Sequence, residues 1–405
     1  MNMLLFEIKK VFSRPKSKII IAALLIVLIA TCILTINRVE YIDENGNHSV
    51  GFSAARNLRE AKNEWSGYLT EDVFREVLAE NKKINNSEEA LSNDIEEQNK
   101  AYARKQGISS ILDVINSAFS GYRDYNYYAA DSVSDEEVAS VYANRVSVLK
   151  SWLETGEETF TENEKDFLIH QYENLETPFY YEYADGWAAL LQNMSTFILI
   201  LALVIGFFVA GIFSDEFQTK ADSVFFSSKY GRTRGSLSKL KAGFCITSGF
   251  YVTFLLLYTF IILFILGADG ANCPIQLDLW RSVYNITFLQ AYLFIALGGY
   301  IGTVFASTLA MLVSAMTRST PAAIVMPFII LCAFPFLSRI ITLPGICSFF
   351  PDQLLEIYVD IKESGLVEIG GRVMTTASVI VPVYAAICLI LQPVLYRVYK
   401  KVEIK

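Results

Sequence analysis

One polar stretch, Ser214 to Lys241, lies between two long apolar runs and orders its charges along the chain. It begins with carboxylates, continues with an apolar triplet and ends with guanidinium groups. Its candidate functional residues are Glu216, Val224, Phe225, Phe226, Arg232 and Arg234.

The apolar side chains of this stretch repeat with helical spacing at Phe217, Ala221, Val224 and Phe225. The spacing predicts a single amphipathic helix over 215–228, with its acidic residues at the favourable N-terminal end. Two interpretations are open. The helix lies on the lipid surface, or its apolar triplet inserts into a groove on a partner protein while Glu216 pairs with a partner base or with the basic turn.

Motifs for nucleotide, metal or acyl chemistry are missing from the sequence. It contains no P-loop, no H-E-x-x-H, no paired C-x-x-C and no G-x-S-x-G. The two histidines, His48 and His170, are far apart along the chain. We therefore expect no enzymatic activity, no metal and no cofactor in this chain, and any transport it performs needs energy from another protein.

Hydrophobic runs of about 18 to 30 residues are long enough to cross a bilayer. The 405 residues are 53% hydrophobic, with a mean hydropathy of +0.36. We predict an all-α polytopic membrane protein with six transmembrane helices, at 19–36 and at about 191–213, 242–266, 288–316, 321–337 and 374–395. These segments contain no Asp, Glu, Lys or Arg, which weighs against an ion-coupled transporter.

The distribution of Lys and Arg predicts the orientation. Both ends of the chain and the 214–241 loop are basic, so we expect the N and C termini and this loop to be cytoplasmic. The predicted domains are a cytoplasmic interfacial helix (1–18), the first span (19–36), a mostly helical extracytoplasmic domain (37–190) and the remaining spans (191–405). The last part includes an outer, re-entrant-like segment at 338–373.

The segment between the first two spans is strongly acidic, with 30 acidic and 13 basic side chains over residues 40–187, a net charge of −17. Capping boxes at Ser134 and Thr161 predict helix starts, and Asn45-Gly46 predicts a two-residue hairpin turn. Tyrosines gather at 121–128 and 179–187. The second group is typical of an aromatic belt at the membrane interface. The first is either core or a ligand-contacting surface.

The cysteines divide between the predicted spans and the predicted outer loops. Cys273 and Cys347 both fall in outer loops, where an oxidising exterior permits a disulfide between them. The alternative is two unrelated thiols, because spacing along the chain does not fix the Cα distance.

The membrane part of the sequence resembles permeases of the ABC-2 exporter type. The resemblance covers residues 1–36 and 191–405 and is carried by the 214–241 loop, by "LLFEIKKVFSRPKSK" before the first span and by "FFPDQLLE" after the fifth. Positions of the family's loop are filled by Glu216, the run 225–228, Gly231-Arg232 and Lys241. The Gly that usually follows the acid is absent here.

This resemblance implies a bacterial plasma-membrane permease that pairs with separate ABC ATPase subunits, which carry ATP and Mg²⁺, and with a second permease chain. Its other partner is membrane lipid, and we expect no nucleic-acid partner. The substrate is not identified by the sequence. A membrane scaffold, phage-receptor-like or secretion-accessory protein, with a large outer domain and no ATPase, is the alternative.

Overall fold

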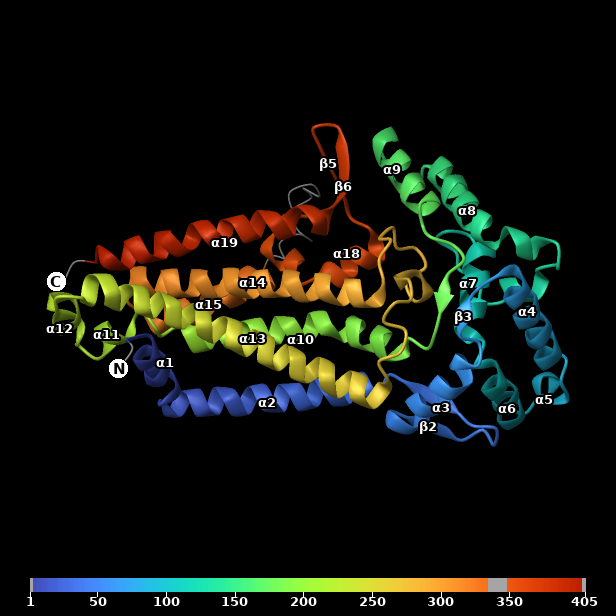
Figure 1. Cartoon of the computed structure of the whole chain (residues 1–405), viewed down its shortest axis with the longest axis horizontal. Coiled ribbons are helices and arrows are strands. Elements are labelled where there is room, and N and C mark those ends of the chain that lie inside the picture. Colours follow the sequence, from blue (N-terminus) through green and yellow to red (C-terminus); the bar gives the residue numbers. More distant parts are fainter. Residues whose placement is uncertain (1–2, 334–347, 403–405) are drawn as a thin grey trace.

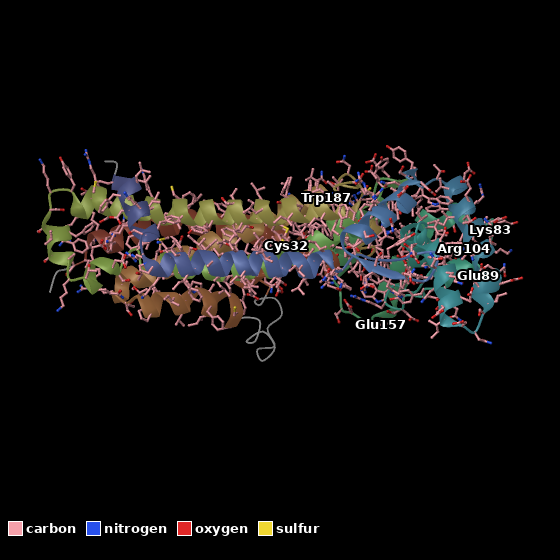
Figure 2. The ribbon with its side chains drawn as sticks, turned by 90° about the horizontal axis from the view of Figure 1, so that it is seen from below. Cys32, Lys83, Glu89, Arg104, Glu157 and Trp187 are labelled. Atoms are coloured by element: carbon pink, nitrogen blue, oxygen red, sulfur yellow. The ribbon has the colours of Figure 1, made fainter. Side chains whose placement is uncertain are left out.

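The computed structural model describes residues 3–333 and 348–402, and most of them are helical. Within these described residues, five helices are long and apolar enough to cross a membrane: α2 (Pro15–Ile36), α10 (Asp185–Val209), α13 (Ser236–Leu266), α14 (Phe288–Thr317) and α19 (Thr376–Lys400). They run side by side along the long axis of the molecule (Figure 1). Nitrogen and oxygen tips gather towards the two ends, and carbon dominates the middle (Figure 2). The chain is therefore built as a multi-pass membrane protein.

Three predicted spans begin earlier in the structure than expected, and one of them is α13, which begins at Ser236 rather than at about residue 242. α1 (Met3–Phe12) occupies most of the predicted interfacial segment, but α2 begins at Pro15 rather than at residue 19. Proline suits the first turn of a helix because its missing N–H would have no partner there. α10 begins at Asp185, six residues earlier than predicted, since its first turns belong to the junction with the preceding domain.

The predicted fifth span, 321–337, is described only in part. α15 (Thr320–Phe328) continues into a π-helical turn, Ile329–Ala333, and residues 334–337 lie outside the described residues. Pro327 sits inside α15 and packs against α10 at Gly206, where a Cβ would come within 2.6 Å of the proline ring. A helix with an internal proline is tolerated in a bundle because neighbours compensate for the lost backbone bond.

α14 is the central helix of the bundle and contacts α10, α13, α15 and α19. Small residues on α14 permit this close packing. A Cβ at Gly299 would lie 2.7 Å from Ile198 and from the Tyr251 hydroxyl, and one at Gly298 would overlap Ile357. A larger side chain at these positions would therefore separate α14 from its neighbours.

The domain between α2 and α10 (residues 37–184), here called the insert, is helical and lies at one end of the bundle (Figure 1). Its helices are α3 (Phe52–Asn63), α4 (Glu71–Asn85), α5 (Glu88–Leu91), α6 (Ile95–Lys105), α7 (Ser109–Phe119), α8 (Val141–Thr155) and α9 (Glu162–Glu173). Phe74, Ile111 and Ile115 are fully or almost fully buried and belong to a core of its own. The charged Lys83, Glu89 and Arg104 lie towards its far end (Figure 2).

Local turn and cap predictions in the insert are mostly confirmed. Thr161 forms a capping box with Glu164 at the start of α9. At Ser134 the capping box is only half formed: the Glu137 carboxylate accepts from the Ser134 backbone N–H and hydroxyl, but the Ser134 side chain caps no backbone N–H, and a 3₁₀ helix (Glu137–Ser140) follows instead of an α-helix. The hairpin around Gly46 exists, but its loop is longer than two residues because the Asp43 carboxylate accepts from the backbone of Asn45 and Asn47.

Short strands make the described fold less purely helical than predicted. Three two-stranded antiparallel sheets pair β1 (Glu40–Ile42) with β2 (His48–Val50), β3 (Gly67–Tyr68) with β4 (Tyr180–Tyr181), and β5 (Leu366–Ile369) with β6 (Arg372–Thr375). The last hairpin falls in the segment predicted as re-entrant-like. Its described part also holds a 3₁₀ turn (Pro351–Leu354) and α18 (Ile357–Glu363).

The second tyrosine group forms the junction of insert and bundle, not an aromatic belt. Tyr181, Tyr183 and Trp187 are buried, and Trp187 lies where the insert meets the bundle (Figure 2). The Tyr183 hydroxyl donates to Leu266 O (2.9 Å) and the Trp187 indole to Ala268 O (3.0 Å). The aromatic groups therefore fix the insert to the end of α13.

Candidate functional site at the loop end of the bundle

The polar loop that follows α10 lies at the end of the bundle opposite the insert, next to α1 and both chain termini (Figure 1). This end is called the loop end below. The loop contains α11 (Asp215–Gln218), α12 (Asp222–Ser227) and a π-helical turn, Gly231–Gly235, which leads into α13. The predicted single helix over 215–228 is wrong. Lys220, with φ 55°, breaks it after one turn.

Charged side chains from four segments meet beneath this loop. Lys239 of α13 lies with its Nζ 2.8 Å from Glu216 Oε1 and 3.1 Å from Glu7 Oε2. Lys10 Nζ is 2.6 Å from the same Glu216 oxygen, and Arg14 binds Asp215 with two hydrogen bonds. This ionic cluster comprises Glu7, Lys10, Arg14, Asp215, Glu216 and Lys239. It ties α1 and the start of α2 to α11 and α13.

The centre of the ionic cluster is out of contact with solvent. Lys239 is 0% exposed, and its third donor bonds Ile212 O at 3.0 Å. A buried ammonium is tolerated only when it is paired and hydrogen-bonded, as here. Because its partners come from α1 and α11, separating any of these segments from α13 would leave a buried charge without a partner.

The phenylalanines of the loop pack inwards onto the end of α19. Phe226 is 4% exposed, and its ring centroid lies 5.2 Å from that of Tyr399, which is fully buried. Phe213 approaches the same tyrosine at 4.7 Å, and Phe225 packs edge-on against Phe226 at 5.1 Å. Phe226 thus holds the loop in place and is not available to insert into a partner.

The basic turn, Gly231–Gly235, is held in place by hydrogen bonds to the end of α19. Arg232 donates to the carbonyls of Lys400 (3.1 Å) and Val402 (2.8 Å), which cap the C-terminal end of α19. A Cβ at Gly231 would lie 1.7 Å from the Phe225 carbonyl oxygen, so only glycine fits at this position. The turn is therefore a fixed connection between α12, α13 and α19.

The solvent-facing side of the loop presents a small apolar and cationic surface. Val224 is 72% exposed and Tyr230 is 45% exposed. Lys229 and Arg234 flank the Tyr230 ring at 5.5 and 4.7 Å. Of the predicted apolar triplet, only Val224 is fully available to a partner, while Phe225 is half-buried.

Several predicted roles are corrected by this arrangement. Glu216 pairs with Lys10 and Lys239 instead of with Arg232 or Arg234. Lys241, matched to the resembled family's loop, is exposed. The sequence reasoning missed Lys239, Glu7 and Tyr399. A signal was available, because a lysine at the start of a long apolar helix needs a counter-charge.

Cys273 of the predicted disulfide is fully buried, with its thiol 3.9 Å from the Glu182 carbonyl oxygen, and the bridge stays a prediction. Cys347 lies outside the described residues. No group of three His, Cys, Asp or Glu side chains in the described part of the chain is placed to hold a metal ion. Comparisons with protein-family models, curated proteins and solved structures found no match to this chain.

Replacing Lys239 by methionine should destabilise the protein, because Glu7 and Glu216 would remain buried without their shared cation. Removing one partner of a buried ion pair costs about 3–5 kcal/mol in free energy of unfolding. Lys241→Met, two residues along the same helix and exposed, is the matched control and should change stability by less than about 0.5 kcal/mol. Thermal unfolding of the detergent-solubilised chain measures both. Equal midpoints for the two variants would show that the cluster does not hold the loop.

The same cluster predicts an acid-sensitive stability. Burial raises the pKa of the Glu216 carboxyl, but Lys239 and Lys10 lower it further, so the net pKa lies below the usual range. The resulting stabilisation is complete above the unfolded-state pKa of about 4.3 and is lost as the pH falls through the folded-state value. Glu216→Gln should flatten the fall in unfolding midpoint below roughly pH 4.3. Glu60→Gln, on the exposed surface of the insert, should keep the wild-type slope.

Proposed function

We propose that this chain is the membrane subunit of an ABC-2 type exporter, and that the loop end receives force from a separate ATPase. The supporting observation is the ionic cluster. It fixes the loop to α1 and α13, while Val224 and Tyr230 remain exposed on the opposite side of the same loop. A partner that moves this exposed surface moves α1, α10 and α13 with it, since the loop cannot shift alone without unpairing Lys239.

In this proposal the loop end faces the bacterial cytoplasm and the insert faces outwards, with six spans and both termini inside. The basic side chains of the loop and of α1 support the orientation through the positive-inside rule. ATP and Mg²⁺ belong to the partner subunits, and a second permease chain completes the path. The absence of a P-loop from the full sequence fits this division of work.

The orientation is tested by single-cysteine labelling of intact cells. Ser151→Cys, on an exposed part of α8, should react with a membrane-impermeant thiol reagent. Ser227→Cys, exposed at the loop end, should react only after permeabilisation. The parent chain gives the background from native thiols. If Ser227→Cys but not Ser151→Cys reacted in intact cells, the chain would have the opposite orientation and the proposal would be wrong.

The coupling role predicts that a charge at Val224 disrupts the ATPase contact. Burying a valine is worth about 1.5–3 kcal/mol, so Val224→Asp should lower recovery of a P-loop ATPase with the full-length chain by roughly tenfold or more. Leu91→Asp is the matched control, because Leu91 in the insert is 71% exposed and Val224 is 72% exposed. ATPase peptides in the purified complex, and stimulated ATP hydrolysis, are the measurements.

Two outcomes contradict the coupling role. If the Val224→Asp protein inserts normally and retains its ATPase, the loop lies on lipid or solvent and carries no coupling contact. If no ATPase accompanies even the wild-type chain, the scaffold alternative takes its place.

A further inference from the structure

A polar cavity of about 490 Å³ lies where the insert meets the segment between α13 and α14. Its walls come from α3, α7, the loop after α7, β4, the first turn of α10 and the 276–281 segment. It is at the opposite end of the molecule from the ionic cluster. Nothing in the proposed coupling role uses it.

Negative charge in this cavity exceeds positive charge. Lys62 Nζ donates to both carboxylate oxygens of Asp185 (2.8 and 2.7 Å) and to the Ser110 hydroxyl (3.0 Å). An ammonium has three donors, so Lys62 has none left for the other three carboxylates that line the cavity, Asp113, Glu182 and Asp278. Asp113 accepts from the Tyr125 hydroxyl at 2.7 Å, and both Asp113 and Asp278 line the cavity with side chains that are exposed to solvent.

Two buried polar atoms at the cavity wall also have no partner. The Tyr181 hydroxyl and Gln276 Oε1 make no hydrogen bond within the described structure, although these residues are 1% and 2% exposed. Burial raises the pKa of Tyr181, and so do Asp185 and Asp113, whereas the nearby Ser110 hydroxyl lowers it; Tyr181 and Gln276 both line the cavity. Buried polar groups are nearly always satisfied in folded proteins, so these two atoms indicate a missing binding partner.

An aromatic wall faces the carboxylates. The Tyr125 ring lies 5.9 Å from Trp280 and 4.8 Å from Tyr127, and all three line the cavity. Aromatic faces attract cations, and carboxylates pair with them. In the first tyrosine group of the sequence, Tyr122 is therefore buried in the core, whereas Tyr125 and Tyr127 line the cavity.

Two further basic side chains line the cavity, Arg123 and Arg281, and both already have neighbours. Arg123 pairs with Glu158 at 2.6 Å, and Arg281 lies over the Trp280 ring at 5.2 Å. The carboxylates do not converge as closely as a metal site requires among the described residues. A bulkier organic cation suits this combination of carboxylates and aromatic rings, because its carbon chain can lie against the rings.

We propose that this cavity binds an organic cation, with an ammonium or guanidinium group between Asp113 and Asp278 and its carbon chain along Tyr125 and Trp280. The proposal rests on the insert and its junction alone and holds whether or not the chain is a transporter subunit. The acidic insert would raise the local concentration of such a ligand.

Calorimetric titration of the full-length, detergent-solubilised protein with 1,5-diaminopentane tests this directly. We expect saturable binding of the diamine, and at least tenfold weaker binding of neutral 1,5-pentanediol and of anionic glutarate. Asp278→Asn and Asp113→Asn should each weaken diamine binding at least tenfold. Asp135→Asn, an exposed aspartate of the insert away from the cavity, is the matched control and should bind like wild type.

The pH dependence adds a second readout. The Asp278 side chain is exposed at the cavity, but the protein atoms crowded around its carboxyl raise its pKa to about 6, as do Asp185 and Asp113, against the opposing effects of Lys62 and Lys362. Diamine affinity should therefore fall between pH 7.5 and 5, and less steeply in Asp278→Asn. Absence of saturable diamine binding to the wild-type protein, equal binding of glutarate, or wild-type affinity in both cavity variants with unchanged unfolding midpoints would each overturn the assignment.

Discussion

The ammonium of Lys239 is the constraint on which the loop end depends. It lies in a position with no access to water, and it is neutralised by carboxylates that come from other segments of the chain, Glu7 on α1 and Glu216 on α11. Burying a charged side chain costs free energy. The buried ion pairs of Lys239 therefore serve to specify a single arrangement of the segments that carry them. The N-terminal helix, the loop after α10 and the start of α13 must be in register before this charge is satisfied.

The packing of the loop's aromatic residues depends on this arrangement of α1, the loop and α13. Exposed phenylalanines in a polar stretch would be unexplained in isolation, but Phe226 fills a space against Tyr399 beneath α12 and is not exposed. What remains on the surface is narrow: Val224, Tyr230 and the basic side chains around it. A partner that docks there would contact a small, rigid patch, whose rigidity comes from the ionic and aromatic groups behind it.

The sequence predicted features that depend on residues close together in the chain. It missed features that depend on contacts between distant segments. Hydropathy located the five long helices, and cap and turn residues located the start of α9 and the first hairpin, since lipid exclusion and backbone caps are local constraints. The helical spacing at 215–228 failed because Lys220 adopts φ 55°, which separates α11 from α12. Likewise, tyrosines next to a span looked like a membrane belt. Only the fold shows Tyr183 reaching Leu266 O.

The two ends of the molecule are joined by the same helices. α10 begins at Asp185, which holds Lys62 of the insert, and leads directly into Asp215 and Glu216 at the loop end. α13 carries Lys239 near its start and accepts the Tyr183 hydroxyl at its last residue. Each helix is thus fixed by a polar contact at both ends and by α14 between them. A tilt of α10 or α13 driven at the loop end would shift Asp185 and Leu266 at the other end, where the cavity of the insert has one of its walls.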